Sequence, residues 1–252
     1  MPPEIRIIGV TGLPEVAEGD DLAALIFEAA RDQSTPLEAG DVVVVTQKIV
    51  SKAEGAVVDL RDVTPSPLAE EFARQFDKDP RHVEVVMRET KRVVRMERGV
   101  LIVETKHGFV CANAGVDASN VPGDERLSLL PRDPDASARR IRSGLMERAG
   151  LLVAVIISDT FGRPWRMGTT DVAIGIAGMH PLRDYRGEVD PYGYPLRVSV
   201  SAVADEIASA AEVVAGKLSM VPVAIARGFS YPPDEEAGSG ELVRDASLDL
   251  FR

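Results

Sequence analysis

The sequence predicts an α+β protein in which mixed sheets carry flanking helices, and three observations support this prediction. Apolar runs rich in valine and isoleucine, such as 42–45 and 151–158, are typical of buried strands. Other stretches repeat apolar residues every three or four positions, as amphipathic helices do. The chain contains neither G-x-x-x-x-G-K-[ST] nor G-x-G-x-x-G, which argues against the P-loop and Rossmann folds.

Length and composition predict a globular protein. The chain has 252 residues, of which 45% are hydrophobic, enough for one domain over 1–252, which could also consist of two interwoven subdomains. A net charge of -11 argues against binding nucleic acid through general phosphate attraction. One cysteine, Cys111, excludes an intrachain disulfide, and no apolar run approaches the roughly 18 residues of a membrane helix. We therefore expect a soluble cytoplasmic protein without a signal peptide.

The N-terminal half alternates predicted strands and helices. Residues 5–10 predict a short strand, and Asp20 or Asp21 is expected to cap an amphipathic helix over 21–34. An all-valine strand follows and ends at Thr46 and Gln47. Further elements are a helix that begins at Ser66 and Pro67 and two strands within the valine- and arginine-rich segment 83–103.

The C-terminal half repeats the alternation. Ser137 is expected to cap a helix that ends at Gly150, and the following apolar run predicts the clearest strand, which leads into Asp159 and Thr160. Later elements are a helix over 201–215, a last strand over 220–228 and an acidic, glycine-rich loop over 232–240.

Two places combine carboxylates with small or polar neighbours. One is Asp117 with Asn120, in a stretch of alanine and glycine that can curl closely around a ligand, and the other is Asp159 with Thr160. Such oxygens suit hard ions such as Mg²⁺ or Mn²⁺, which keep waters and bridge to phosphates. Each aspartate taken alone is more often a turn residue or a helix cap. Zinc is disfavoured because one cysteine and three dispersed histidines offer no recognised spacing.

Two lysines follow the all-valine strand. Lys48 and Lys52 are four residues apart, so on a helical turn they project to the same side, where they could hold a triphosphate. The alternative is a solvated basic pair.

The segment 158–175 mixes charged, hydroxyl and aromatic side chains. Arg163 and Arg166 are suited to a carboxylate or phosphate, and the only tryptophan, Trp165, could stack on a planar ring. Trp165 could equally be a core residue. The segment 183–197 is a candidate lid or subunit contact.

Five motifs, in this order, resemble the coenzyme F420:L-glutamate ligase family, also called the F420-0:gamma-glutamyl ligases. They are TGLPE, VVVVTQKIVSKAEG, ETKHGFVCANAGVDASNV, VIISDTFGRPWRMGTTDVAIG and VPVAIARG, and the similarity runs from about residue 5 to 230. The resemblance implies a fold specific to the family and a homodimer. Since the chain has no nitroreductase-like extension of the kind found in actinobacterial relatives, it resembles the standalone form.

The resemblance also implies an activity. Family members use GTP to add L-glutamate to a deazaflavin coenzyme precursor through an amide bond, with Mg²⁺ or Mn²⁺ required and K⁺ stimulating in some cases. Phosphoryl transfer would convert the precursor carboxylate into an acyl phosphate, which the glutamate amine then attacks. This chemistry needs positioning and charge neutralisation and no protein nucleophile, in agreement with the absence of a Ser, Cys or His triad pattern.

Site residues follow from the resemblance position by position. Metal ligands fall on Asp117, Asp159 and Thr160. Nucleotide contacts fall on Gly12, Leu13, Pro14, Glu15, Gln47, Lys52, Asn120, Gly216, Lys217, Leu218, Ser219, Met220, Val221 and Pro222. The family has an acidic second-metal residue in the last of these segments, where this chain has Lys217, which leaves a second metal in question.

Catalytic roles are expected for Lys52 on the phosphates and for Arg163 or Arg166 on the acceptor. Two alternatives stay open at this stage: a related amide ligase that acts on another carboxylate, and a nucleotide- or metal-binding module without catalysis.

Overall fold

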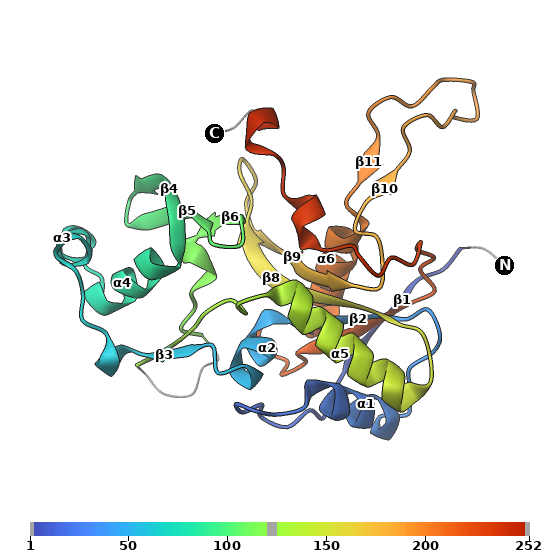
Figure 1. The fold of residues 1–252 in the computed structure, drawn as a ribbon, viewed down its shortest axis with the longest axis horizontal. Helices are drawn as coiled ribbons and strands as arrows, with labels where there is room; N and C mark the ends of the chain where they lie inside the picture. Colours follow the sequence, from blue (N-terminus) through green and yellow to red (C-terminus); the bar gives the residue numbers. More distant parts are fainter. Residues whose placement is uncertain (1–2, 120–124, 250–252) are drawn as a thin grey trace.

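The computed structural model describes residues 3–119 and 125–249, and its largest sheet has five strands. In spatial order these are β1 (Arg6–Val10), β12 (Val223–Arg227), β2 (Val42–Thr46), β8 (Ala154–Gly162) and β9 (Thr169–Ala177). Only β2 and β8 are parallel, and the other neighbours are antiparallel. This mixed sheet with its flanking helices confirms the predicted α+β class (Figure 1).

Helices cover both faces of this sheet. Helices α1 (Leu22–Asp32) and α5 (Pro134–Ala149) pack on one face, and α6 (Val203–Ala215) packs on the other. Because successive strand residues point to opposite faces, Val43 and Val45 join the first core while Val42 and Val44 join the second. Burial on both faces explains why β2 and β8 are apolar throughout instead of alternating.

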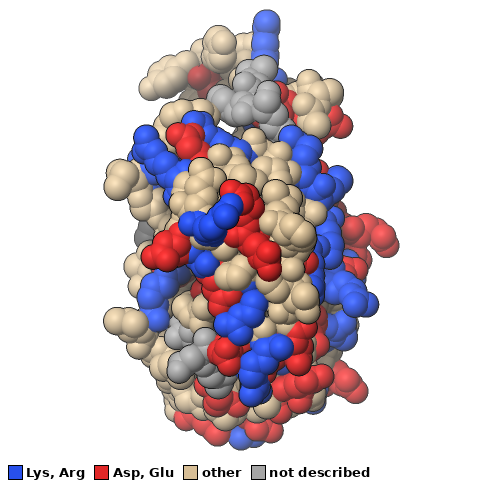
Figure 2. Space-filling view, turned by 90° about the vertical axis from the view of Figure 1, so that its left-hand side faces the viewer, with Lys and Arg blue, Asp and Glu red and all other residues tan. Residues whose placement is uncertain are grey.

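A second lobe has its own apolar cluster. It contains α3 (Pro67–Phe76), α4 (Pro80–Glu89) and a three-stranded sheet of β4 (Thr90–Glu97), β5 (Val100–Thr105) and β6 (Val110–Ala112). The short pair β3 (Val57–Asp59) and β7 (Arg126–Ser128) and the 3-10 turns η1 (Leu60–Asp62) and η2 (Asn113–Gly115) complete it. Figure 2 faces this lobe and shows acidic and basic side chains interspersed over its surface.

The prediction of two strands within 83–103 is wrong in its first part. Residues Pro80–Glu89 form α4, and only the remainder forms strands β4 and β5. Asp79 caps the helix by accepting from the backbone N–H of Arg81, and Pro80 stands in its first turn. This cap, and burial of Val83 and Val86 on one helix face, outweigh the strand propensity of valine.

The start of α5 is also corrected. Asp133 caps it and Pro134 begins it, whereas Ser137, predicted as the cap, lies one turn inside and donates its hydroxyl to the Asp133 carbonyl. The predicted end is confirmed, because Gly150 adopts a left-handed conformation with φ of 66°.

Two features lie outside the main layers. The strands β10 (Arg183–Asp184) and β11 (Val200–Ser201) form the base of a long arm that projects away from the sheet (Figure 1). The C-terminal segment returns over the sheet through η3 (Ser239–Leu242) and η4 (Ala246–Leu248). None of the helices within 3–119 and 125–249 is both long and apolar enough to cross a membrane.

Candidate functional site

Sheet topology brings four segments to one edge. Strands β1, β2 and β8 run in one direction and end there, while β12, antiparallel to its neighbours, begins there. The pairings of Val10 with Val223 and of Thr46 with Ser158 fix this alignment. The segment 12–15 after β1, the start of α2 (Gln47–Ala53), the end of β8 and the segment 216–222 before β12 therefore meet at the same edge. Four of the predicted site segments are thus neighbours.

Helix α2 starts directly from β2 at this edge. Gln47 is 2% exposed and donates from Nε2 to Ser51 Oγ at 2.6 Å and to the Leu129 carbonyl at 2.7 Å. Ser51 donates to the same carbonyl at 2.6 Å. The amide of Gln47 therefore anchors the chain near residue 129 to α2.

The second predicted residue on α2 joins two segments. Lys52 Nζ lies 2.6 Å from Glu15 Oε1, so the ammonium ties the segment after β1 to α2. Leu13 packs against the main core, while Gly12, Pro14 and Glu15 stay exposed. The ion pair thus holds the exposed segment around Glu15 against the largely buried Lys52 side chain.

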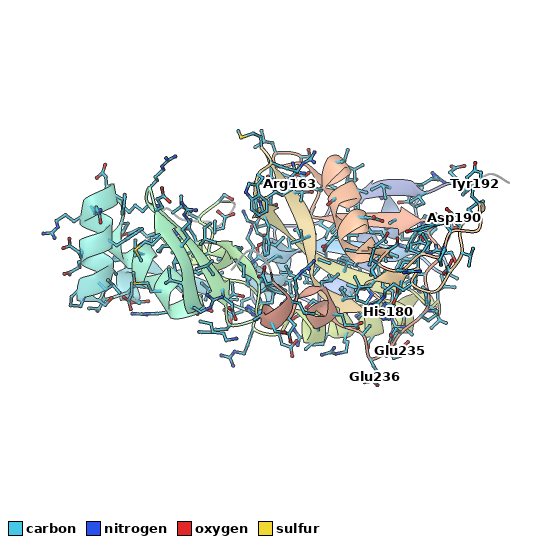
Figure 3. The ribbon with its side chains drawn as sticks, turned by 90° about the horizontal axis from the view of Figure 1, so that it is seen from above. Arg163, His180, Asp190, Tyr192, Glu235 and Glu236 are labelled. Carbon is cyan, nitrogen blue, oxygen red and sulfur yellow. The ribbon has the colours of Figure 1, made fainter. Side chains whose placement is uncertain are left out.

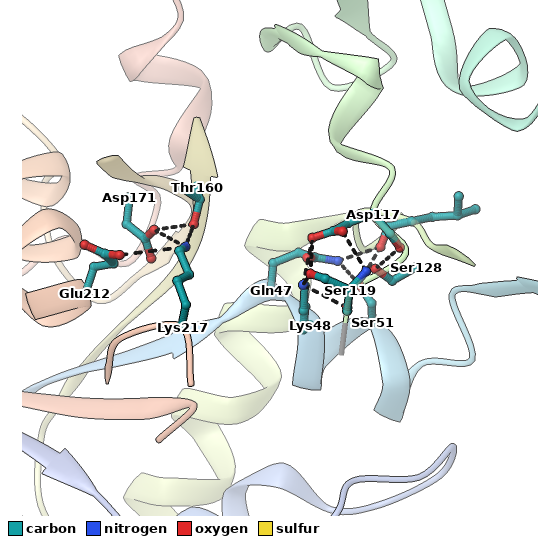
Figure 4. A network of polar contacts seen from close by, with 11 residues as sticks. Gln47, Lys48, Ser51, Asp117, Ser119, Ser128, Thr160, Asp171, Glu212 and Lys217 are labelled. Atoms are coloured by element: carbon teal, nitrogen blue, oxygen red, sulfur yellow. Dashed lines mark hydrogen bonds and ion pairs between the residues drawn. The ribbon is translucent and has the colours of Figure 1, made fainter. Parts of the chain in front are cut away.

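Lys48 binds Asp117, which belongs to a segment far away in the sequence (Figure 4). Its Nζ lies 2.7 Å from Asp117 Oδ2 and donates to the Ser119 carbonyl at 2.9 Å. Asp117 also accepts from the backbone N–H of Ser119 at 2.8 Å and from its hydroxyl at 2.9 Å. Burial alone would raise the pKa of the Asp117 carboxyl, but these donors outweigh it and hold that pKa below its ordinary value. Asp117 is therefore ionised and oriented.

Asp159 has the opposite electrostatic character. Burial, with the nearby negative charges of Asp171 and Asp117, raises its pKa to about 7, although the Thr160 backbone N–H and the charge of Lys48 oppose the shift. Thr46, two residues before Lys48, pairs with Ser158, so the ion pair of Lys48 with Asp117 brings Asp117 to the end of β8 that carries Asp159. Burial thus dominates the environment of Asp159, whereas hydrogen bonds and the Lys48 charge outweigh burial at Asp117.

A second polar cluster surrounds Thr160, two residues before the end of β8 (Figure 4). Thr160 donates to Asp171 Oδ1 at 2.6 Å and accepts from Lys217 Nζ at 2.5 Å. Lys217 Nζ lies 3.7 Å from Glu212 Oε1 and 4.0 Å from Asp171 Oδ1. The Lys217 ammonium therefore sits among three oxygens and joins the segment before β12 to β8.

The three predicted metal ligands, Asp117, Asp159 and Thr160, fit a hard divalent ion in part. Within 3–119 and 125–249 no group of three or more His, Cys, Asp and Glu side chains is arranged to hold a metal. Two carboxylates and the Thr160 hydroxyl lie at the edge, so an ion there would take its remaining oxygens from water and from phosphate. That donor set is the one Mg²⁺ uses when it bridges a protein to a nucleotide.

The predicted acceptor residues lie on the β8–β9 turn. Trp165 is 81% exposed, so the core alternative for it is wrong. Arg163 donates to the backbone carbonyls of Met167 and Gly168, and Arg166 is exposed. In Figure 3, Arg163 is well separated from Tyr192 at the tip of the arm. Asn120 lies outside the described residues.

Three residues of these clusters were not assigned a role from the sequence, namely Ser119, Asp171 and Glu212, and Lys48 was predicted as one of a basic pair that could hold a triphosphate but not as the partner of Asp117. The four-residue spacing of Lys48 from Lys52 was a usable signal, and Asp171 stood in a motif that was recognised. Nothing in the sequence singles out Glu212 on α6 or Ser119 on its turn.

The fold and the residues at this sheet edge define the class of protein. It is an α+β protein outside the P-loop and Rossmann folds, and charged groups from distant segments meet at one edge of its mixed sheet. Comparison with known proteins gives the particular family. The chain belongs to the F420-0:gamma-glutamyl ligase family, whose profile matches residues 11–228.

Three relatives, each named coenzyme F420:L-glutamate ligase, match nearly the whole chain. The protein of Methanothermobacter thermautotrophicus is 45% identical over 250 residues, which cover 98% of this chain and 99% of that one. The protein of Methanopyrus kandleri is 44% identical, covering 99% and 98% respectively. The protein of Haloarcula marismortui is 42% identical, covering 98% and 96%.

Proposed function

We propose that this protein is a GTP-dependent ligase that joins L-glutamate to a deazaflavin coenzyme F420 precursor through an amide bond. The single observation that carries the proposal is the meeting of four separate segments at one sheet edge in a chain of this family. The reaction is taken from the names of relatives whose alignments cover almost the whole chain.

The edge suits the proposed nucleotide. The segments 12–15 and 216–220 lie at the same edge as α2 and are exposed apart from Leu13, so they can contact a purine triphosphate there. Lys52, and Lys48 beside it, would place positive charge near the terminal phosphates, which acquire negative charge during transfer. Gln47 would act indirectly, by fixing the start of α2.

Asp117, Asp159 and Thr160 would hold Mg²⁺ or Mn²⁺. When bound, the ion would neutralise phosphate charge and supply positive charge beside Asp159. Lys48 keeps Asp117 ionised and oriented toward the edge. K⁺ is a further proposed cofactor, and Lys217 already places one positive charge beside Thr160.

The proposed reaction has two steps. The precursor carboxylate attacks the γ-phosphorus of GTP, which breaks the bond to GDP and leaves an acyl phosphate. The glutamate amine then attacks the acyl carbon, releases phosphate, loses a proton and forms the amide. Arg163 and Arg166 would bind the anionic groups of the precursor, and exposed Trp165 would stack on its ring.

We also propose a homodimer. The arm over 183–201 is a two-stranded ribbon in which Tyr192 is 96% exposed and Val198 and Tyr194 are exposed as well. Such a ribbon is marginally stable in isolation, and its apolar side chains would be covered by a second copy.

Incubation of the protein with GTP, Mn²⁺, L-glutamate and the precursor tests the activity. We expect GDP and a product heavier by one glutamyl unit in mass spectrometry, both dependent on glutamate and precursor. Asp159→Asn should lower turnover by about 100-fold or more, since it removes a metal ligand. The matched control is Asp32→Asn, which removes an exposed carboxylate paired with Arg31 at the end of α1.

Two results would contradict the proposal: no glutamylated product from folded wild-type protein, or full turnover by Asp159→Asn. Product formation with other carboxylates, but not with the precursor, would identify a different amide ligase.

A further inference from the structure

The second lobe contains a cavity that the proposed reaction leaves without a role. It lies between α3, α4, β5 and η2 and has a volume of about 140 Å³. Phe72, Val86 and Leu101 form an apolar wall, and Lys78, His82 and Asn113 supply polar groups. A cavity of this kind, apolar with a few polar groups, is typical of a small-molecule site.

The cavity adjoins the candidate site. Asn113, in its wall, lies four residues before Asp117, and η2, which contains Asn113, packs against α4. A ligand in the cavity would therefore lie close to the chain segment that carries Asp117.

Volume distinguishes among the three proposed substrates. The cavity of about 140 Å³ holds on the order of ten non-hydrogen atoms, because one water molecule needs roughly 10–15 Å³ of such space. L-Glutamate has about ten such atoms, whereas a purine triphosphate has about thirty and the deazaflavin precursor more still. The whole amino acid fits, whereas only a part of either larger substrate could enter.

The charges of the lining favour a carboxylate. Lys78 provides an ammonium group, and the Asn113 amide can donate a hydrogen bond. Asp79 also lines the cavity, but its carboxylate accepts hydrogen bonds from Arg81, with a distance of 2.7 Å to Arg81 Nη2, so its charge is compensated. The apolar wall would pack against the methylene groups of a short dicarboxylic amino acid.

We infer that this cavity is the glutamate subsite, with a carboxylate against Lys78 and Asn113 and the amine directed toward Asp117. The inference rests on the proposed ligase function. A glutamate subsite in the second lobe would also explain why this lobe lies next to Asp117, because the glutamate amine must reach the activated carboxylate at the sheet edge.

The backbone at Asn113 limits which substitutions are informative. Asn113 has φ of 52°, a left-handed conformation that asparagine, aspartate and glycine tolerate better than other residues. Asn113→Asp keeps the shape and backbone preference and puts a negative charge against the substrate carboxylate. Asn113→Gly removes the side chain in a residue suited to that conformation.

The test measures glutamate affinity in the full chain. Ligand-observed NMR with L-glutamate alone, in the absence of nucleotide and precursor, reports binding directly, and steady-state kinetics give KM for glutamate and for GTP. We expect Asn113→Asp and Lys78→Met to raise KM for glutamate about ten-fold or more, with KM for GTP changed less than about two-fold. Asn113→Gly should raise it less, since it introduces no repulsion.

The matched control is Lys106→Met, which removes a surface lysine paired with Glu89 at 3.1 Å, away from the cavity. It should leave both KM values unchanged. Glutarate, which lacks the amine, should compete with glutamate for binding, and thermal melting verifies that each variant is folded.

The outcomes separate this inference from the proposed function. Amide formation by wild-type protein with unaltered glutamate KM in folded Asn113→Asp and Lys78→Met would overturn the subsite and leave the ligase function intact. Glutamate binding that these variants abolish, in a wild-type protein that forms no amide, would support the subsite and overturn the ligase function.

Discussion

Removal of the Lys48 ammonium should loosen the turn that carries Asp117. Lys48→Met keeps the length and apolar stem of the side chain but deletes contacts to Asp117 Oδ2 at 2.7 Å and to the Ser119 carbonyl at 2.9 Å. Asp117 would retain its two bonds from Ser119. The variant therefore tests whether the ion pair, and not the turn alone, holds Asp117 at the edge.

The expected magnitude follows from distance and exposure. Unit charges 2.7 Å apart attract by about 1.5 kcal/mol even in a medium as polar as bulk water. Fully exposed pairs contribute about 0.2–1 kcal/mol, because ordering the side chains offsets part of the attraction. Since the Lys48 side chain is only 22% exposed and that of Asp117 45%, we expect a coupling free energy of about 1–2 kcal/mol.

A double-mutant cycle measures this coupling. Urea unfolding of wild type, Lys48→Met, Asp117→Asn and the double variant yields the free energy of unfolding of each, and the cycle isolates the pairwise part. Lys106→Met combined with Asp117→Asn is the control, with coupling near zero. A Lys48–Asp117 coupling below about 0.3 kcal/mol would refute the argument.

Three further predictions concern other residues. Lys217→Met should change the free energy of unfolding by less than about 1 kcal/mol, because the Lys217 side chain is largely exposed. It should nevertheless lower kcat/KM for GTP about ten-fold, because it removes the positive charge beside Thr160. Unchanged kinetics would contradict the placement of Lys217 at the nucleotide. Burial, with the charge of Asp159, raises the pKa of the Cys111 thiol to about 12, so the thiolate fraction at pH 8 is about 10⁻⁴. A thiol reagent should therefore label Cys111 at least about 100-fold more slowly than it labels free cysteine. Rapid labelling of the folded protein would contradict this burial. Ile225 is fully buried on β12, which lies between β1 and β2. Ile225→Ala should lower the free energy of unfolding, measured in urea, by about 2–5 kcal/mol. A loss below about 1 kcal/mol would show that the surrounding core collapses around the smaller side chain.

Elements with strong local signals agree with prediction. The all-valine strand β2 and the apolar strand β8 are buried on both faces, and such strands read as continuous apolar runs. Gly150 ends α5 because a left-handed residue satisfies the last turn. Each of these signals is contained within a few neighbouring residues, so no knowledge of distant partners is needed.

Elements that depend on distant partners were missed. Strand β9 begins with polar residues and is defined by its pairing with β8, where Thr160 faces Asp171. Helix α4 contains three buried valines, a residue type typical of strands, and its burial against the second core decides its conformation.

For the site, the sequence and the family resemblance predict the chemistry, and tertiary structure shows which side chains are partners. Asp117 and Asp159 stand out from sequence and family resemblance because carboxylates among small residues are what a divalent ion requires. Lys48 pairs with Asp117, whereas burial dominates at Asp159, and both depend on how α2, the Asp117 turn and the parallel strands β2 and β8 come together. Electrostatic energies fall with distance and with exposure to water, and neither quantity is determined until the sheet has brought residues more than sixty positions apart to a common edge.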